Sequence, residues 1–209
     1  MTTSELRLAT RDLACIRGGR LVFEGLSFEV AAGHALVLTG PNGAGKSSLL
    51  RQIAGLLEIE QGEIALEGGD PERGISEQAH YAGHLDGLKP SMSVIETLRF
   101  WAAYLGGGDA AAAERALEAM VLAPLADLPV AYLSAGQKRR LSLARLAVAP
   151  RPLWLLDEPS VALDAASVAR LRGFMAAHLA GGGIIVAATH LDLGLANARE
   201  LRLGREVPA

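Results

Sequence analysis

The sequence predicts an α/β fold in which a mainly parallel sheet is flanked by helices. Two apolar runs, residues 153–156 and 184–188, are continuous rather than alternating, as expected for strands buried on both faces of a parallel sheet. A third run, residues 35–39, is followed by a glycine-rich loop and then by leucines at helical spacing through Leu57. Because helical patterns alternate with these runs, we expect the ligand at the carboxyl edge of the sheet.

The glycine-rich loop fits the pattern G-x-x-x-x-G-K-[ST] between a strand and a helix, which predicts a P-loop nucleoside triphosphatase core. Its backbone N–H groups should surround phosphate oxygens, Lys46 should reach the outer phosphates, and the Ser47 hydroxyl should ligate Mg²⁺. The plain alternative is a glycine-rich turn that precedes Lys-Ser by chance. The candidate ATP-binding residues in this loop are Gly40, Pro41, Asn42, Gly43, Ala44, Gly45, Lys46, Ser47 and Ser48.

Length and composition limit the remaining choices. The 209 residues suffice for one main core, and we expect a single domain over residues 1–209. No apolar run approaches the roughly 18 to 20 residues that cross a bilayer, and the first residues lack an export signal. The single cysteine, Cys15, fits a reducing cytoplasm. A net charge of −3 and 4% aromatic residues argue against a nucleic-acid partner.

The N-terminal part should be antiparallel. Short β-like runs at residues 6–10 and 26–30 are separated by glycines, and residues 62–69 read as a further strand and turn. Residues 70–78 are polar and predict a loop. A different region begins at residues 81–84, and we interpret residues 85–150 as a helical lobe inserted in the core.

Within this lobe, two capping boxes predict helix starts. Ser93 and Glu96 begin a helix that ends at glycines 106–108, and an alanine-rich helix is expected over residues 109–122. Ser134 and Gln137 have the same spacing and begin another helix. A further helix is expected at residues 165–180.

Taken together, the motifs resemble the nucleotide-binding domain of ATP-binding cassette (ABC) proteins over nearly the whole chain. The sequence Leu-Ser-Ala-Gly-Gln at residues 133–137 is a near match to that family's signature Leu-Ser-Gly-Gly-Gln. The other matching positions are the phosphate loop 40–47, the strand and carboxylates 153–158, residues 162–164 and His190.

The resemblance assigns roles at the strand ends. Asp157 would hold Mg²⁺, and Glu158 would polarise the water that attacks the γ-phosphate. The alternative for this pair is a capped strand end with solvated carboxylates. His190 would hydrogen-bond the γ-phosphate and hold the attacking water in line, a role that comes from the resemblance alone.

The signature begins a helix and therefore forms a second anion site in a chain that already has a phosphate loop. In the resembled family it binds the γ-phosphate held by another subunit, so that two copies pair head-to-tail and enclose two ATP molecules. The alternative is an ordinary capped helix. The implied contacts across the dimer are Ser134, Ala135, Gly136, Gln137 and Asp164.

Two positions depart from the family pattern. His84 stands where the family usually has a glutamine that touches Mg²⁺ and the attacking water, and an imidazole there has a charge that depends on pH. Arg17 stands where an aromatic residue usually stacks on adenine. A guanidinium plane can also stack on a base, and an exposed charge is the alternative.

The short chain and its motif variants most resemble the ATP-binding subunit of the heme exporter of bacterial cytochrome c maturation. The variants include Tyr-Ala-Gly-His at residues 81–84 and Thr-His-Leu-Asp-Leu at residues 189–193. The resemblance implies a peripheral ATPase on the cytoplasmic face of the inner membrane, docked on separate transmembrane subunits and acting indirectly on a heme chaperone. The 5 histidines are scattered and Cys-x-x-Cys-His is absent from the sequence, so heme binding by this chain is not expected.

Three alternatives remain from the sequence. The chain could serve an ABC transporter for another substrate, or be a soluble ABC ATPase in iron–sulfur assembly, translation or DNA repair. The soluble proteins of translation and DNA repair generally carry a second cassette, a coiled coil or a basic extension, which this sequence lacks. A P-loop kinase would leave the signature unexplained.

Overall fold

The computed structural model describes residues 5–84, 86–106 and 111–204 of the chain. The chain separates into two compact units. We call the first, formed by Met1–Tyr81, Pro152–Glu158 and Met175–Ala209, the sheet unit. The second, formed by Ala82–Arg151 and Pro159–Phe174, is the helical unit. Parts of the predictions that fall on residues 1–4, 85 and 107–110 lie outside the described residues.

The larger sheet has the order β5-β6-β7-β3-β8. Its pairs β6–β7, β7–β3 and β3–β8 are parallel, which confirms the mainly parallel sheet. Every residue of β6 and of β7 is buried, as their continuous apolar sequences predict. The strands are β3 (Ala35–Thr39), β5 (Ala79–Ala82), β6 (Leu153–Asp157), β7 (Ile184–Ala188) and β8 (Ala198–Arg202).

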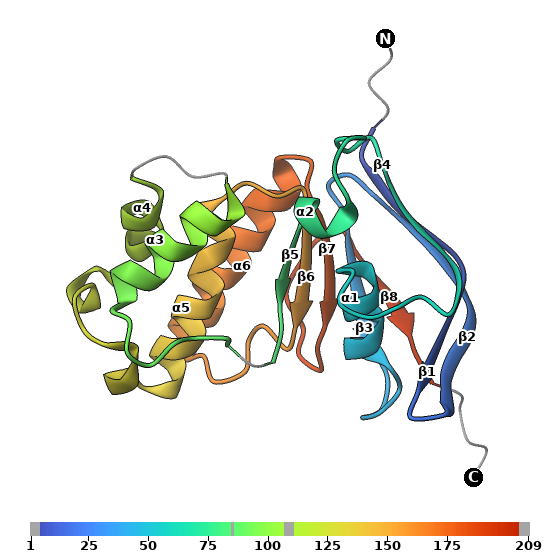
Figure 1. Ribbon diagram of the computed structural model, residues 1–209, viewed down its shortest axis with the longest axis horizontal. Coiled ribbons are helices and arrows are strands. Elements are labelled where there is room, and N and C mark those ends of the chain that lie inside the picture. Colours follow the sequence, from blue (N-terminus) through green and yellow to red (C-terminus); the bar gives the residue numbers. More distant parts are fainter. Residues whose placement is uncertain (1–4, 85, 107–110, 205–209) are drawn as a thin grey trace. The chain divides into compact units, whose positions relative to one another are not determined.

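A second, antiparallel sheet is formed by β1 (Arg7–Arg17), β2 (Arg20–Ala31) and β4 (Gln61–Glu67), in the order β2-β1-β4. Helix α1 (Lys46–Ile53) lies between the two sheets (Figure 1). Its leucines share one apolar core with side chains of both sheets, because one face of each sheet must be buried.

The helical unit contains α3 (Val94–Leu105), α4 (Ala112–Ala119), α5 (Ala135–Val148) and the start of α6 (Ala165–Ala180). Helices α3, α4 and α5 pack against one another. Both predicted capping boxes are formed, at Ser93 and at Ser134. Two short 3₁₀ helices, Ala123–Leu125 and Val130–Tyr132, precede α5. None of the helices in the described ranges is long and apolar enough to cross a membrane.

Several boundaries differ from the predictions. Helix α1 ends at Ile53, because Gly55 adopts a positive φ of 69°, so Leu56 and Leu57 lie beyond it. The predicted loop 70–78 contains the short helix α2 (Ile75–Gln78). We predicted that the helical region begins at residues 81 and 82, but these residues end strand β5. Strand β8 was not predicted.

Candidate nucleotide-binding site

Three neighbouring strands of the parallel sheet end at the same level. The register aligns Leu38 of β3 with Ala188 of β7, and Ala188 with Asp157 of β6. The phosphate loop follows β3, His190 follows β7 by two residues, and Glu158 follows β6 directly. The sheet therefore brings these predicted groups to its carboxyl edge, where open parallel sheets bind ligands.

Two glycines of the loop are required by its surroundings. Gly45 has φ 99°, and a Cβ atom on it would lie 2.5 Å from Cγ1 of Val22 and 2.9 Å from Cδ1 of Phe23. Gly40 has φ 125°, and a Cβ atom there would collide with the backbone oxygen of Leu203. Strand β2 and Leu203, which directly follows β8, therefore pack closely on two positions of the loop.

Lys46 is only 8% exposed. Its Nζ donates hydrogen bonds to the backbone oxygens of Gly40, at 2.7 Å, and Pro41, at 3.1 Å. The ammonium is therefore held inside the loop by two carbonyls. Phosphate oxygens, which carry full charge, are stronger partners for an ammonium than carbonyl oxygens.

The two carboxylates after β6 have different environments. Asp157 is buried at 4% exposure, whereas Glu158 has a partly exposed side chain. Glu158 adopts a left-handed backbone with φ 46°, and its N–H donates to the Ala188 oxygen at 2.8 Å. This conformation costs a non-glycine residue roughly 1–2 kcal/mol. Strain of this kind is concentrated at functional sites.

His190 lies beside Glu158. Its Nε2 is 3.7 Å from Oε1 of Glu158, and its side chain is 54% exposed. The separation is too long for a hydrogen bond but close enough for charge attraction when the imidazole is protonated. The two proposed partners of the attacking water are therefore neighbours.

The edge also has suitable ligands for Mg²⁺. Helix α1, which begins at Lys46 and Ser47, packs against β6 and β7. A hydroxyl from Ser47 and a buried carboxylate from Asp157 are the hard oxygen donors that Mg²⁺ takes, and it completes its shell with waters and substrate phosphates. Within the described ranges, the structure has no group of three or more His, Cys, Asp or Glu that would form an all-protein site.

Arg17 lies at the end of the β1–β2 hairpin, where it pairs with Arg20 across the Gly18–Gly19 turn and is exposed. The hairpin touches the helix of the phosphate loop. Burial raises the pKa of the Cys15 thiol, and a hydrogen bond with Ser48 at the start of α1 opposes this shift. Arg17 therefore belongs to a hairpin that packs beside the candidate phosphate site.

The signature residues open α5 in the helical unit. Ser134 Oγ accepts from the Gln137 N–H at 3.2 Å, and Gln137 Oε1 accepts from the Ser134 N–H at 2.7 Å. A Cβ atom on Gly136 would lie 3.0 Å from the backbone oxygen of Ala162. The loop that leads to α6 thus packs closely on the first turn of α5, next to Ala135.

Asp164 has a structural role that was not predicted from the sequence. Its Oδ1 accepts the Ser167 N–H at 2.7 Å, which makes it the capping residue of α6. This hydrogen bond holds the pKa of Asp164 below its usual value. The side chain is exposed. Its expected contact across a dimer stays a prediction.

The candidate residues divide between the two units. The phosphate loop, Arg17 and the residues after β6 and β7 belong to the sheet unit. The exposed His84, the signature and Asp164 belong to the helical unit. Val22 and Phe23, which pack on Gly45, were missed, because only the tertiary packing of β2 on the phosphate loop places them there.

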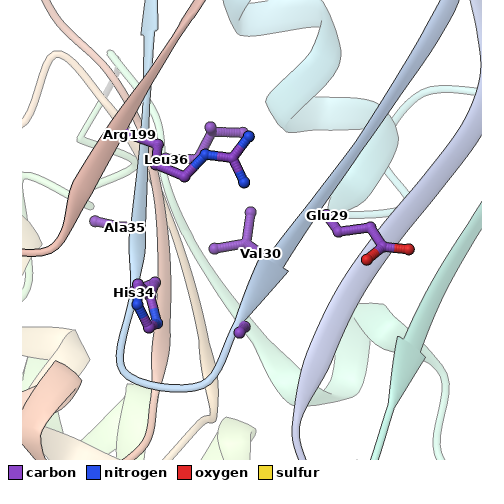
Figure 2. A pocket seen from close by; sticks show the side chains of 7 residues that line it. Glu29, Val30, His34, Ala35, Leu36 and Arg199 are labelled. Carbon is purple, nitrogen blue, oxygen red and sulfur yellow. The ribbon is translucent and has the colours of Figure 1, made fainter.

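A cavity of about 180 Å³ lies elsewhere in the sheet unit. It is lined by residues of β2 and by the amino end of β3, the opposite end of that strand from the phosphate loop. Figure 2 shows Arg199 reaching from β8 toward Val30, with His34 at the turn before β3. None of the predicted site residues lines this cavity.

The sequence profile described as "ABC transporter" matches residues 23–161, which include the phosphate loop, the signature and both carboxylates. This chain belongs to the ABC transporter family.

Curated ABC relatives extend the similarity to nearly the full chain. A protein of Nitrobacter winogradskyi named "Cytochrome c biogenesis ATP-binding export protein CcmA" is 58% identical over 199 residues, covering 95% of this chain and 98% of the relative. A protein of the same name from Rhodopseudomonas palustris is 60% identical with the same coverage.

A solved ABC structure supports the fold. The putative ABC transporter ATP-binding protein of Pyrococcus furiosus superposes with a TM-score of 0.81 at 25% identity, covering 94% of this chain and 97% of that structure. Part of a bacterial Atm1-family ABC exporter with ATP bound has the same fold, with a TM-score of 0.79 at 23% identity over 98% of this chain and 39% of that one. The α/β core and its helical unit are therefore those of an ABC ATPase.

Proposed function

We propose that this chain is the ATP-hydrolysing subunit of the ABC exporter that supports c-type cytochrome biogenesis, the heme exporter predicted from its motifs. The observation that carries this proposal is the 58% identity, over 95% of the chain, to a protein named for cytochrome c biogenesis and export. The two units would together form one ABC ATP-binding domain, with the helical unit as the inserted lobe.

The residues at the sheet edge would bind the phosphates of ATP and the Mg²⁺ ion. The backbone N–H groups of residues 40–48 would bind the phosphates, and Lys46 would exchange its carbonyl partners for the outer phosphate oxygens. Ser47 and Asp157 would hold Mg²⁺, which neutralises charge on the phosphates when it is bound.

Glu158 would act as the general base. Its carboxylate would accept a proton from the attacking water, and His190 beside it would hydrogen-bond the γ-phosphate and keep that water in line. His84 would take the place of the family's glutamine near the water and the metal. Arg17 would stack its guanidinium plane on the base.

Completion of the site would need a second copy of the chain. The helix start at Ser134, Ala135 and Gly136 would bind the γ-phosphate held by the partner, with Gln137 and Asp164 contributing to the contact. Separate transmembrane subunits would carry this dimer on the cytoplasmic face of the bacterial inner membrane. A heme chaperone would be reached through those subunits.

Affinity purification from native membranes tests this assignment. The tagged chain should co-purify with transmembrane proteins after mild detergent extraction, and the complex should hydrolyse ATP. Glu158→Gln in the same complex should keep the partners and lose hydrolysis. Recovery of the chain only from the soluble fraction, with no membrane protein attached, would favour a soluble ABC ATPase instead.

A further inference from the structure

Arg139 on α5 is a charged side chain in the interior of the helical unit, with 4% exposure. Its Nη1 donates to the backbone oxygen of Gly83 at 2.8 Å and to Oδ1 of Asp86 at 3.1 Å. Its Nε donates to the backbone oxygen of Pro159 at 3.3 Å. One guanidinium thus joins three segments that are far apart in the sequence.

The acceptors flank two of the proposed functional residues. Gly83 and Asp86 stand on either side of His84, and Pro159 directly follows Glu158. Helix α5, which carries Arg139, begins with the signature. A planar guanidinium has fixed hydrogen-bond directions, so it constrains the positions of all three acceptors at once.

Stability alone accounts poorly for this arrangement. A guanidinium carries a charge, and taking it out of water has a desolvation cost that the attraction within a single ion pair seldom exceeds. Asp86 is the acidic partner in the described contacts, with a side chain that is 26% exposed. An apolar residue would fill the same space without that cost, so the specific gain is the placement of Gly83 and Asp86.

We propose that Arg139 is a positioning residue for ATP hydrolysis, which holds Gly83 and Asp86, on either side of His84 in the sequence, against the signature helix so that His84 is correctly placed. The inference rests on the proposed function of His84. Arg139 would act on turnover and not on nucleotide affinity, because its three described acceptors lie outside the phosphate loop. Movement of α5 would be passed to His84 through the same side chain.

A double-mutant cycle on the purified full chain tests the proposal. Arg139→Lys keeps the positive charge but loses the planar guanidinium with its fixed hydrogen-bond directions. His84→Ala removes the imidazole. Each should lower kcat by roughly 10- to 100-fold, the loss expected when a catalytic group is misplaced by about 1 Å, with the KM for ATP within about twofold of the wild-type value. The double variant should be no slower than the slower single variant, because both changes remove the same contribution of His84 to hydrolysis.

Arg151→Lys is the matched control. Arg151 lies in the same unit, and its Nη2 donates at 2.6 Å to the backbone oxygen of Leu105, which is not one of the described acceptors of Arg139. It should leave kcat at the wild-type value. If Arg139→Lys fails to fold, Asp86→Asn removes only the charged acceptor, and it should give a smaller loss of kcat that is again not additive with His84→Ala.

Three results would overturn the proposal: a wild-type kcat for both the Arg139 and Asp86 variants, losses that multiply in the double variant, or a loss confined to KM. A slow Arg139→Lys combined with a wild-type rate for His84→Ala would also overturn it, because Arg139 could not then act through His84. Failure of the ATPase assignment is recognised separately, by hydrolysis that survives Glu158→Gln.

Discussion

Local backbone geometry sets the position of the Glu158 carboxylate. Its left-handed conformation, with φ 46°, turns the chain at the end of β6 and is held by the hydrogen bond to Ala188. The carboxylate then lies beside His190, whereas the neighbouring Asp157 is buried. Adjacent carboxylates with different solvent access suit different roles, one as a metal ligand and the other as a base.

Lys46→Ala should weaken ATP binding. The change removes a charge-assisted contact worth about 1.5–3 kcal/mol, which corresponds to roughly 10- to 150-fold in the dissociation constant. Calorimetric titration with ATP measures the effect. Lys89→Ala, at an exposed lysine of the helical unit, is the control and should bind normally. An unchanged affinity for the Lys46 variant would show that this side chain does not contact the phosphates.

At the residue scale, the sequence predicted groups whose chemistry is tied to a local pattern. Lys46, Asp157 and Glu158 lie in a loop and a strand end that the sequence marks directly. Arg139 could not be predicted, because its neighbours on α5 give no sign that it faces Gly83 and Pro159. These contacts depend on tertiary packing, because Asp86 is 53 residues and Pro159 is 20 residues from Arg139 in the sequence.

At the scale of the helix, the capping boxes of α3 and α5 are chemically similar but differ in expected function. In each, a serine hydroxyl accepts the N–H of the third helical residue at 3.2 Å. Only the Ser134 box belongs to the signature. A comparison of the two capping boxes can therefore distinguish the effect of a serine cap on stability from the proposed role of Ser134 at an anion site.

Ser93→Ala and Ser134→Ala should lower the free energy of unfolding by similar amounts, about 1 kcal/mol each. Only Ser134→Ala should also reduce ATP hydrolysis, because it alone is expected to meet the γ-phosphate. Urea unfolding and steady-state hydrolysis of both variants make the comparison. Equal activity of the two variants would mean that Ser134 is merely a helix cap.

We expect His178 in α6 to make the stability of the sheet unit depend on pH. Its ring stacks on Trp154 of β6 with centroids 3.9 Å apart, and its Nε2–H donates to the Ile184 oxygen at 3.3 Å. Burial lowers the pKa of His178 below its ordinary value of 6.5. As the pH falls below about 6.5, the unfolded chain binds the proton before the folded chain does. The stability that neutral His178 contributes is therefore fully present above that pH and is lost as the pH falls below it.

Comparison of His178→Phe with the wild type tests this dependence. Phenylalanine keeps a ring beside Trp154 but cannot be protonated. Urea unfolding at pH 7.5 and 5.5 should show a larger loss of stability in the wild type than in the variant. The carboxyl groups with lowered pKa values, such as Asp164 and Glu96, titrate below this range. Equal losses in the two proteins would contradict the assignment.

At the element scale, helix α6 and the buried strand β7 were predicted well, and the exposed edge strand β8 was not. Helix α6 and strand β7 have the predicted bounds, 165–180 and 184–188. Strand β8 has the sequence Ala-Arg-Glu-Leu-Arg and is largely exposed, so it lacks the apolar pattern of a buried strand. It forms only through pairing with β3.

At the scale of the molecule, the chain holds two different candidate phosphate sites. One is the loop 40–47 in the sheet unit, and the other is the start of α5 in the helical unit. The family resemblance predicts that these sites bind different nucleotides in a symmetric dimer. The two helix starts follow from the sequence of one chain, whereas the second copy of the chain comes from the resemblance alone.

Glu158→Gln should trap this dimer. The variant is expected to bind MgATP and fail to hydrolyse it, so sedimentation at saturating MgATP should give twice the 21.8 kDa mass of the chain. The same variant with MgADP, and a double variant that also carries Lys46→Ala, should remain monomeric. A monomer of Glu158→Gln in saturating MgATP would contradict the paired arrangement.

The most direct test of the central claim is made in cells whose sole copy of the gene carries Lys46→Ala or Glu158→Gln. Covalent heme staining of their membranes reports mature c-type cytochromes, and the spectra of b-type cytochromes serve as the internal control. The account predicts loss of all c-type cytochromes with b-type cytochromes intact. Normal c-type staining in both variants would contradict it and would assign this ABC ATPase to another exporter.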